Sequence, residues 1–587
     1  MKERFGRKWL ILLTLVVLAA LIASCGPAAT PIVVEKEKVV EKPVVQTVVV
    51  EKEKVVEKPV VQTVIVEKVV EPTKASVAPP PRRGGQLVYA AQSLIKTLDP
   101  GNPLDYPNSY EVVDLIFDRL VRFDGNLQIH PELAKSWEVS KDGLTWTLFL
   151  RDDVKFHDGT PFNAQAVKAH VERMLDRDWA LPNRALWDHI TSVNVVDDYT
   201  VQFVTAKPFG PMLFYMAHGS GGIVSPAAVE KWGKDFAEHP VGTGPYKVES
   251  FTPGVEVVLV QNTEYWGSPA PLDRIVVKTV VEPGARVAML ETGEANIIDQ
   301  VPVEEVDRLT RNPSVKILQQ TGLRTFCMQF FLDRPTLQDL KVRQALNHAV
   351  DVQTIVDTIF LGQGKPLDSP VSSTMPGHVS VGRYDYDPGK AKSLLNEAGW
   401  SDTNGDGIVD KGGEPLRLKI LYSTGYPKEE EVVEAVRQYL ADVGVELELW
   451  EVERGGVRTY QKVSRKEVQY DIANWGFNPS NGDITYHLES SWVSNPDDQA
   501  PPYMWNLSWY SKPEVDDLLL RTKFGEEAVD PNKRVELLAE AQRIIWNDAP
   551  ALWLYSLEIL AATRANVEGV VILPTIFLNL REARFSE

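Results

Sequence analysis

The loop formed by residues 402–410 carries a regular series of side chains that could bind a metal ion through oxygen. It reads D-T-N-G-D-G-I-V-D, so that Asp402, Asn404, Asp406 and Asp410 stand at positions 1, 3, 5 and 9. EF-hand loops offer Ca²⁺ oxygen ligands in this order, with glycine at position 6. Position 12 is glycine instead of the usual glutamate, and the residues that follow read as a strand. Two interpretations stay open, a structural calcium site and an Asx-turn at the surface.

The two cysteines of the chain predict different chemistry. Cys25 follows a basic start and an apolar run, Trp9–Ala23, that is shorter than the roughly 20 residues of a membrane-spanning helix. This pattern indicates a signal peptide. The run ends in L-I-A-S-C-G, which resembles a bacterial lipoprotein box, so we expect cleavage before Cys25 and lipid attachment to its thiol. An uncleaved signal anchor is the alternative. Cys327 is expected in the core, and two cysteines exclude a disulfide framework.

An internal repeat follows the predicted lipid site. Residues 33–48 read VVEKEKVVEKPVVQTV, residues 49–64 repeat the same letters, and a decayed third copy extends to about residue 74. Pro43 and Pro59 would interrupt a long helix, and no Phe, Trp, Tyr or Leu occurs between Pro27 and Gln86 to build a core. We therefore expect a disordered tether over residues 25–83. A short coiled coil or an adhesin stalk is the alternative.

The rest of the chain, residues 84–587, has the composition of a large soluble protein. It is too long for one hydrophobic core, so two or three domains are expected. The net charge of the whole chain is −19, and loss of residues 1–24 removes four basic side chains and one acidic one. Such a charge disfavours binding to nucleic acid or to anionic lipid surfaces. Attachment to a membrane would then depend on the lipid alone.

Local patterns predict several elements of this body. Trp137–Val139 and Leu144–Leu150 alternate apolar and polar residues on either side of a K-D-G turn, which is typical of a hairpin. Asn163 stands where the N-cap of a helix beginning near Ala164 is expected. Val193–Val204 reads as a second hairpin, and Tyr110–Val121 as an amphipathic helix. Strands and helices do not alternate regularly, which favours α/β domains with chain crossings.

The first of these hairpins belongs to a longer motif, Pro131–Gly159, which reads P-E-L-A-K-S-W-E-V-S-K-D-G-L-T-W-T-L-F-L-R-D-D-V-K-F-H-D-G. It resembles the signature of the extracellular solute-binding proteins that serve ABC transporters for oligopeptides, dipeptides and nickel. Lys135, Trp146 and Leu148 are its main departures from the family pattern. Further segments that resemble the family follow in order, so that the resemblance covers essentially all of residues 84–587: His239–Val248, Asn262–Gly267, Ala288–Asp299, Lys341–Asp351 and Tyr386–Trp400.

The resemblance implies an α/β, two-lobed, periplasmic-binding-protein-like cleft fold of the large three-domain subgroup. Carried onto this chain, lobe one comprises residues 84–126, 236–322 and 552–587, an inserted domain comprises 127–235, and lobe two comprises 323–551. The lobes would close on a solute, because a ligand that binds both lobes favours the closed form. The resemblance further implies an exported monomer, tethered at the outer face of the bacterial cytoplasmic membrane, that delivers its solute to permease subunits with a cytoplasmic ATPase.

The resemblance also implies where the solute binds. Tyr470–Gly476 resembles the strand that leads to the ligand loop of peptide-binding members, in which an aspartate three residues after the tryptophan pairs with the peptide ammonium. Here Asn478 takes that place, and an amide cannot neutralise an ammonium. The nearest acid downstream is Asp483. The candidate ligand residues are Trp475, Asn478, Asp483, Tyr106 and Gln92. The expected solute is an oligopeptide or a dipeptide-like molecule; an oligosaccharide or another neutral solute is the alternative, and Trp475 could equally belong to the core.

Two further functions find less support. Nickel binding is disfavoured because none of the nine histidines forms a close pair along the chain, and His157 is expected to hydrogen-bond within its own turn. His218–Gly222 (H-G-S-G-G) superficially resembles the oxyanion loop of esterases. A G-x-S-x-G nucleophile elbow is absent around Ser220. An exported hydrolase is therefore a remote alternative, and we expect a binding protein with no catalytic residues and no cofactor beyond the calcium ion considered above.

Overall fold

The computed structural model describes residues 84–102, 108–423, 428–453, 457, 463–495, 505–575 and 577–586. The predicted signal peptide, the lipid site Cys25 and the predicted tether lie outside the described residues, and so does Tyr106. Among the helices that the structure describes, none combines the length and the apolar character needed to cross a membrane.

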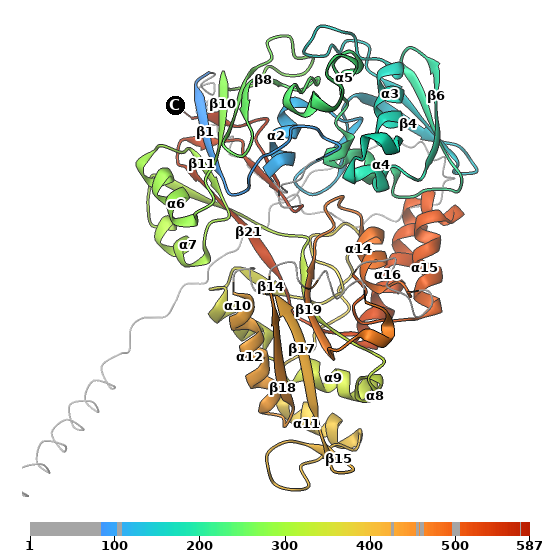
Figure 1. Ribbon diagram of the computed structural model, residues 1–587, viewed down its shortest axis with the longest axis vertical. Helices are drawn as coiled ribbons and strands as arrows, with labels where there is room; N and C mark the ends of the chain where they lie inside the picture. The colour runs from blue at the N-terminus through green and yellow to red at the C-terminus, as the bar shows by residue number, and fades with distance from the viewer. Residues whose placement is uncertain are drawn as a thin grey trace, which may run out of the picture. The chain divides into compact units, whose positions relative to one another are not determined.

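The largest sheet, here called the β1 sheet, is built from segments that lie far apart in the sequence (Figure 1). Its central strand β1 (Gln86–Ala91) pairs in parallel with both β10 and β11, whereas the other pairings are antiparallel. Its remaining strands are β12 (Val315–Thr321), β21 (Tyr555–Arg564), β11 (Ile297–Asp299), β10 (Arg274–Thr279), β9 (Glu256–Gln261), β8 (Tyr246–Thr252) and β14 (Gly364–Pro366). Helices α2 (Asn108–Ile116), α6 (Pro283–Thr292) and α7 (Val303–Thr310) accompany it. Leu87 and Ile275 are fully buried in its core.

A second sheet, the β13 sheet, has the order β18-β17-β19-β13-β20. Strand β17 runs parallel to β18 and β19, and β13 runs antiparallel to β19. Its strands are β18 (Glu446–Val452), β17 (Arg417–Ser423), β19 (Ile472–Phe477), β13 (Thr325–Phe330) and β20 (Ala551–Trp553). The α-helices described between β13 and β20 in the chain are α8 (Pro335–Gln338), α9 (Leu340–His348), α10 (Val352–Ile359), α11 (Pro388–Glu397), α12 (Glu429–Ala441), α14 (Ile484–Trp492), α15 (Pro513–Phe524) and α16 (Pro531–Asp548). Cys327, on β13, is buried as expected.

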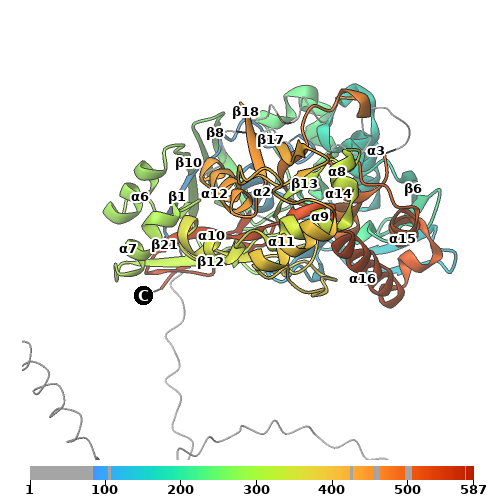
Figure 2. The ribbon, with the colours of Figure 1, turned by 90° about the horizontal axis from the view of Figure 1, so that it is seen from below.

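A third sheet, the β5 sheet, contains both predicted hairpins. Its order is β4 (Ala134–Val139), β5 (Thr145–Leu150), β7 (Thr200–Thr205) and β6 (Ile190–Asp197), all antiparallel. Helix α3 (Ala164–Leu175) begins where predicted, because the Asn163 side chain accepts a hydrogen bond from the backbone N–H of Ala166 at 3.0 Å. Helices α4 (Met212–Ala217) and α5 (Pro226–Trp232) follow. Helices α15 and α16 lie next to each other on the same side of the molecule as this sheet (Figures 1 and 2).

Short strand pairs complete the fold. They are β2 (Val121–Phe123) with β3 (Ile129–Pro131), β15 (Asp410–Lys411) with β16 (Glu414–Pro415), β22 (Val567–Glu568) with β25 (Arg584–Phe585), and β23 (Val571–Leu573) with β24 (Phe577–Asn579). The predicted helix 110–121 is shorter than expected. Helix α2 ends at Ile116, whose carbonyl accepts a hydrogen bond from the N–H of Gly244, and residue 121 already belongs to β2.

Two chain segments pass directly from one large sheet to the other. Gly322–Arg324 joins β12 of the β1 sheet to β13, and Leu554 joins β20 of the β13 sheet to β21. A change in the angle between the sheets must be taken up in such connections, as in other hinged proteins. The residue limits predicted for the three domains stay a prediction.

Candidate functional site

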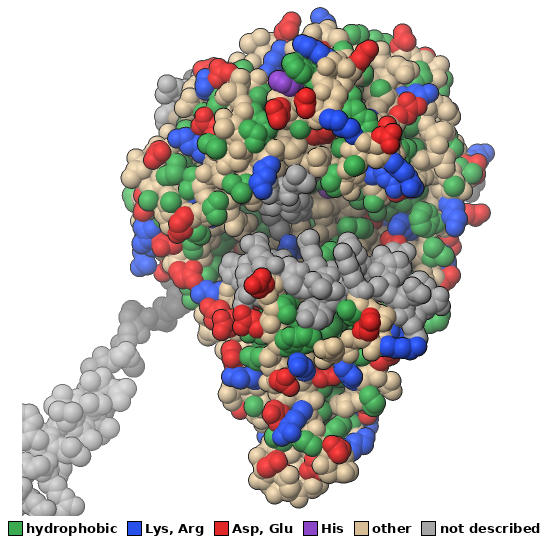
Figure 3. All heavy atoms as spheres, viewed as in Figure 1, with side chains coloured by type: hydrophobic (Ala, Val, Ile, Leu, Met, Phe, Trp, Pro, Cys, Tyr) green, Lys and Arg blue, Asp and Glu red, His purple; other side chains and the backbone are tan. Residues whose placement is uncertain are grey.

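The edges of the two large sheets provide the framework of a site. Because β17 and β19 are parallel, their carboxyl ends, Ser423 and Phe477, lie at the same edge, where β13 begins at Thr325 opposite Phe477. In open α/β sheets, ligands bind outside the carboxyl ends of the strands. In the β1 sheet the corresponding ends are those of β1, β10 and β11. On the face shown in Figure 3, the surface is hollowed between the part that holds the β1 sheet and the part that holds the β13 sheet.

Trp475 lies at this edge, on β19, and is half-buried. Its ring stacks on that of Trp505, with 4.4 Å between the ring centres and 16° between the planes. Its indole N–H finds no hydrogen-bond acceptor among the described residues. Part of the ring also packs against the core around Ala473 and Tyr470. Trp475 therefore combines a packing role with an indole that is not fully enclosed.

Asn478 and Asp483 occupy different environments, although both follow β19. Asn478 is half-buried. Asp483 is fully buried, caps helix α14 by accepting a hydrogen bond from the N–H of Tyr486 at 3.1 Å, and forms a short ion pair with Arg534. Arg534 also donates to the Thr485 hydroxyl at 2.7 Å. The expectation that Asp483 supplies the missing acid of the cleft needs correction, because its charge is already neutralised by Arg534.

Gln92 directly follows β1 and belongs to a buried polar network that sequence reasoning missed. Its backbone N–H donates to the Asp299 carboxylate at 2.9 Å. The side-chain amide of Asn108 donates to both Asp299 and Glu111 at 2.8 Å, and the Tyr89 hydroxyl contacts Glu111 at 2.7 Å. Burial, and then the neighbouring Asp299 charge, raises the pKa of Glu111 to about 8. The N-x-x-E spacing at the start of α2 is the only sequence signal for this network.

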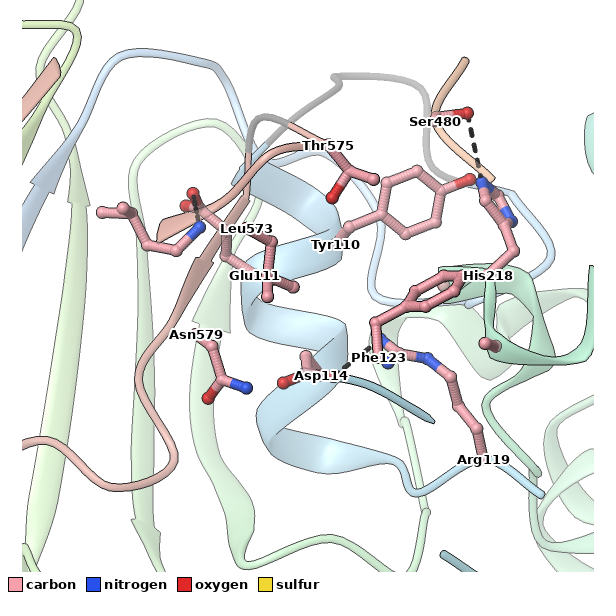
Figure 4. A pocket seen from close by; sticks show the side chains of 13 residues that line it. Tyr110, Glu111, Asp114, Arg119, Phe123, His218, Ser480, Leu573, Thr575 and Asn579 are labelled. Atoms are coloured by element: carbon pink, nitrogen blue, oxygen red, sulfur yellow. Dashed lines mark hydrogen bonds and ion pairs between the residues drawn. The ribbon is translucent and has the colours of Figure 1, made fainter. Parts of the chain in front are cut away.

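A small cavity lies where the loop after β19 meets α2 and α4, and Figure 4 shows its lining. Its volume of about 20 Å³ accommodates one or two water molecules. Six of the residues around it are Tyr110, Arg119, Phe123, His218, Ser480 and Thr575. The cavity is too small for a peptide, so a solute that used these groups would have to move the two sides apart.

The glycine-rich segment around His218 forms one wall of this cavity. Ser220 is fully buried, and its hydroxyl contacts Trp187 Nε1 at 3.3 Å and His218 Nδ1 at 2.9 Å. Burial, together with the nearby charge of Arg119, lowers the pKa of His218 to about 3, so the imidazole is neutral. His218 Nε2 contacts the Ser480 hydroxyl at 3.4 Å (Figure 4). A serine held in this way is not presented to a substrate, unlike the nucleophile of a hydrolase.

The loop 402–410 is held by hydrogen bonds of the Asx-turn type. Asp402 accepts from the N–H groups of Gly405 and Gly407, and Asp406 accepts from that of Ile408. Asn404 accepts from the N–H of Asp406, and the buried Asp410 accepts from Thr403. Within the part of the chain that the structure describes, no three or more His, Cys, Asp or Glu residues gather in a way that could hold a metal ion. The calcium site stays a prediction.

His157 differs from the expectation. Instead of bonding within its own turn, its Nε2 contacts the carbonyl oxygen of Gly244 at 2.9 Å, 87 residues further along the chain. The turn lies against this segment, since the backbone N–H of His157 also donates to Gly242. Burial lowers the pKa of His157 to about 4, so this contact holds with a neutral ring.

Comparisons with known proteins agree with this architecture. The family model for "Bacterial extracellular solute-binding proteins, family 5 Middle" matches residues 128–499. The chain is 31% identical over 490 residues to the glutathione-binding protein GsiB of Salmonella typhimurium, covering 83% of this chain and 92% of that one. The structure of a nickel ABC transporter from Bacillus halodurans is 28% identical with a TM-score of 0.72, covering 85% of this chain and 99% of the other.

The ABC transporter-associated periplasmic binding protein DppA from Helicobacter pylori, in complex with the peptide STSA, is 26% identical with a TM-score of 0.67, covering 86% and 99%. These likenesses confirm the predicted α/β periplasmic-binding-protein fold. The relatives are solute-binding proteins of transport systems and not enzymes, which fits the expected absence of catalysis. The chain belongs to family 5 of the bacterial extracellular solute-binding proteins.

Proposed function

We propose that this protein captures an oligopeptide or a dipeptide-like solute between its β1 and β13 sheets and delivers it to the permease of an ABC importer. The observation that carries this proposal is the position of Trp475, half-buried at the carboxyl edge of β19, beside a loop whose Ser480 contacts His218 on the other side. An aromatic face at such an edge suits the apolar and planar parts of a peptide. The peptide and glutathione named for two of its relatives support the same class of solute.

Titration calorimetry with glutathione, short peptides and short oligosaccharides tests this function. Trp475→Ala should weaken binding by about 2 kcal/mol or more, as anchoring aromatic residues do. Its free energy of unfolding should fall by less than the roughly 3–5 kcal/mol expected for an emptied core site. Trp492→Ala is the matched control, because Trp492 is buried in the core and should lose stability without a specific loss of binding. Equal binding by the parent and Trp475→Ala would remove Trp475 from the site.

A neutral solute such as an oligosaccharide is the second candidate, and the amide of Asn478 favours it. Asn478→Asp separates the two classes. The new carboxylate should improve binding of peptides with a free ammonium through a charge-assisted hydrogen bond. It should weaken binding of a neutral sugar, because the half-buried charge would lack a partner in the complex. If the substitution changes the affinity for neither class, the loop after β19 does not contact the solute.

We infer that the protein is exported and anchored to the membrane by a lipid on Cys25. A lipid on Cys25 would hold the exported body at the outer face of the cytoplasmic membrane, facing the periplasm or the cell surface, and residues 25–83 would give it reach. Cys25→Ser should release a folded body from the membrane fraction, whereas deletion of residues 33–74 should leave both the membrane fraction and the thermal midpoint unchanged. Membrane retention of Cys25→Ser would contradict the lipid anchor.

A further inference from the structure

Glu429 is a half-buried carboxylate at the carboxyl edge of the β13 sheet. It is the first residue of α12, the helix that follows β17. Its Oε1 accepts a hydrogen bond of 2.8 Å from the side-chain amide of Asn474, a buried residue on β19, and its Oε2 lies 3.5 Å from the Ser423 hydroxyl. Among the described residues, none makes an ion pair with Glu429 within 4.0 Å. The backbone N–H of Ser423 also donates to this carboxylate. A carboxylate accepts about four hydrogen bonds, so capacity for another donor remains.

The charged and titratable groups around Glu429 belong to several elements. Arg324 stands in one connection between the large sheets and favours the ionised form of Glu429. Tyr555, at the start of β21 in the other connection, has its pKa raised by burial and then by the charge of Glu429. Tyr422 on β17 also experiences that charge, together with those of Glu430, Glu434 and Glu451. Groups from both connections between the two sheets are thus within electrostatic reach of Glu429.

The balance of these effects leaves the carboxyl group close to half-protonated in neutral solution. Burial raises the pKa of Glu429 to about 7, although the Asn474 amide and the Ser423 hydroxyl each favour the carboxylate. A half-buried carboxylate with no ion-pair partner within 4.0 Å is costly, and an ammonium group within hydrogen-bond distance would reduce that cost. Binding of such a cation would favour the ionised form and release a proton.

We propose that Glu429 binds a protonated amine of the solute and takes the place of the acid that the chain lacks at position 478. This inference rests on the proposed function, and it names a feature of the solute, a free ammonium group. Asp483 does not compete for this role because Arg534 neutralises it. Asn474, four residues before Asn478 on the same chain segment, holds the Glu429 carboxylate through its side-chain amide.

Proton release gives the test its most specific readout. Calorimetric titrations at pH 7, in buffers that differ in ionisation enthalpy, would use glutathione and trialanine as probes, each compared with its N-acetylated form. The parent protein should bind the free amines with release of a fraction of a proton and should lose this release with the N-acetylated probes. Glu429→Gln, which keeps the shape and the contact with Asn474, should abolish the release. It should weaken binding of the free amines by about 10-fold or more, as expected for a lost charged hydrogen bond.

The exposed neighbour Glu430 provides the control, since Glu430→Gln removes one negative charge from the same helical turn without touching the site. Thermal unfolding of both variants establishes that they fold. If the parent binds free amines without proton release, and Glu429→Gln binds them equally well, the inference is wrong while the proposed function stands. If the parent binds none of the four probes but binds an oligosaccharide, the ammonium site and the peptide class both fail.

Discussion

The Nε2–H of His218 points to the hydroxyl of Ser480 across 3.4 Å and links the segment after α4 to the loop after β19. The direction of the bond follows from the other ring nitrogen, since Nδ1 accepts from the backbone N–H of Ser220 at 3.2 Å. The Ser220 hydroxyl, in turn, accepts a hydrogen bond from the indole N–H of Trp187 and donates one to Nδ1 of His218. A chain of hydrogen bonds therefore runs from the core around the β5 sheet to the edge of the β13 sheet.

We expect the contact between His218 and Ser480 to favour the closed arrangement of the two lobes. Ser480→Ala should shift the solute-free protein toward more open forms, whereas Ser480→Thr keeps the hydroxyl and should behave as the parent. Because the bond is long, its contribution should lie near the lower end of the usual range, about 0.5–1 kcal/mol, or a two- to fivefold change in the closed-to-open ratio. Small-angle X-ray scattering would report the radius of gyration. An unchanged radius in Ser480→Ala would mean that the contact does not influence closure.

A second contact crosses between the two large sheets at a different place. The Nζ of Lys428, just before α12, lies 2.7 Å from a carboxylate oxygen of Glu304 in the first turn of α7. Each single charge reversal, Glu304→Lys or Lys428→Glu, should favour opening, and the double reversal should restore closure. Exposed ion pairs contribute about 0.2–1 kcal/mol, and the effect should fade at high salt because the charges are screened.

The neighbouring residue supplies the control for this charge reversal. Glu305 pairs with Arg308 inside the same helix, so Glu305→Lys changes the same charge without touching Lys428. The radius of gyration at low and high salt would be compared for all variants. If Glu305→Lys opens the protein as much as Glu304→Lys does, the effect is one of net charge and the specific pair has no role.

The local elements could be predicted from the sequence because their causes are local. The β4–β5 hairpin follows from the alternation around the K-D-G turn, and the start of α3 follows from the cap at Asn163. Asp483 and His157 could not be placed in this way, because their partners Arg534 and Gly244 lie 51 and 87 residues away in the chain. Which groups meet there depends on how the sheets and helices pack, and no spacing in the sequence records it.

The same limit applies to Glu429, the carboxylate that we propose for the ammonium group. Family resemblance directs attention to the residues after Trp475, where Asn478 and Asp483 stand. Glu429 precedes them by more than 40 residues in a run of three glutamates, and only the parallel pairing of β17 with β19 brings its helix beside Asn474. Nothing in the sequence distinguishes Glu429 from the other two glutamates of this run, which are exposed.

Arg581 gives a prediction about stability. Its buried guanidinium contacts Asp118 at 2.7 Å and Glu132 at 2.8 Å, and it also pairs with Asp114 at 3.2 Å. Arg581→Met should destabilise the protein by about 3–5 kcal/mol, because the carboxylates would stay buried without their cation. Urea unfolding would measure the loss. Arg584→Met is the control, since Arg584 makes an exposed pair with Glu568 and should change stability by less than about 1 kcal/mol. Similar losses in both variants would contradict a special role for the buried cluster.

The last prediction concerns the buried Glu111, whose pKa in the folded protein is raised from 4.5 to about 8. Between pH 4.5 and pH 8 the folded state holds a proton on Glu111 that the unfolded chain has lost. The contribution of this proton to stability is therefore fully present below about pH 4.5. That contribution declines as the pH rises and is lost through pH 8. Each pH unit of this interval corresponds to at most about 1.4 kcal/mol. Glu111→Gln, a neutral side chain of similar shape, should therefore fall in stability less steeply than the parent from pH 5 to pH 8.

The comparison of the two proteins isolates the network of Glu111 and Asp299, because Glu132 and Glu429, whose pKa values are raised to about 7, lie outside it and titrate equally in both. Urea unfolding at pH 5, 6, 7 and 8 would give the difference in unfolding free energy at each pH. That difference should move in favour of Glu111→Gln as the pH rises, and a constant offset between the two curves would contradict the prediction. In that case Glu111 would be ionised throughout this pH range. The hydrogen bonds that its carboxyl group accepts from the Asn108 amide and from the backbone N–H of Leu578 would then outweigh the cost of burying two carboxylates in one network.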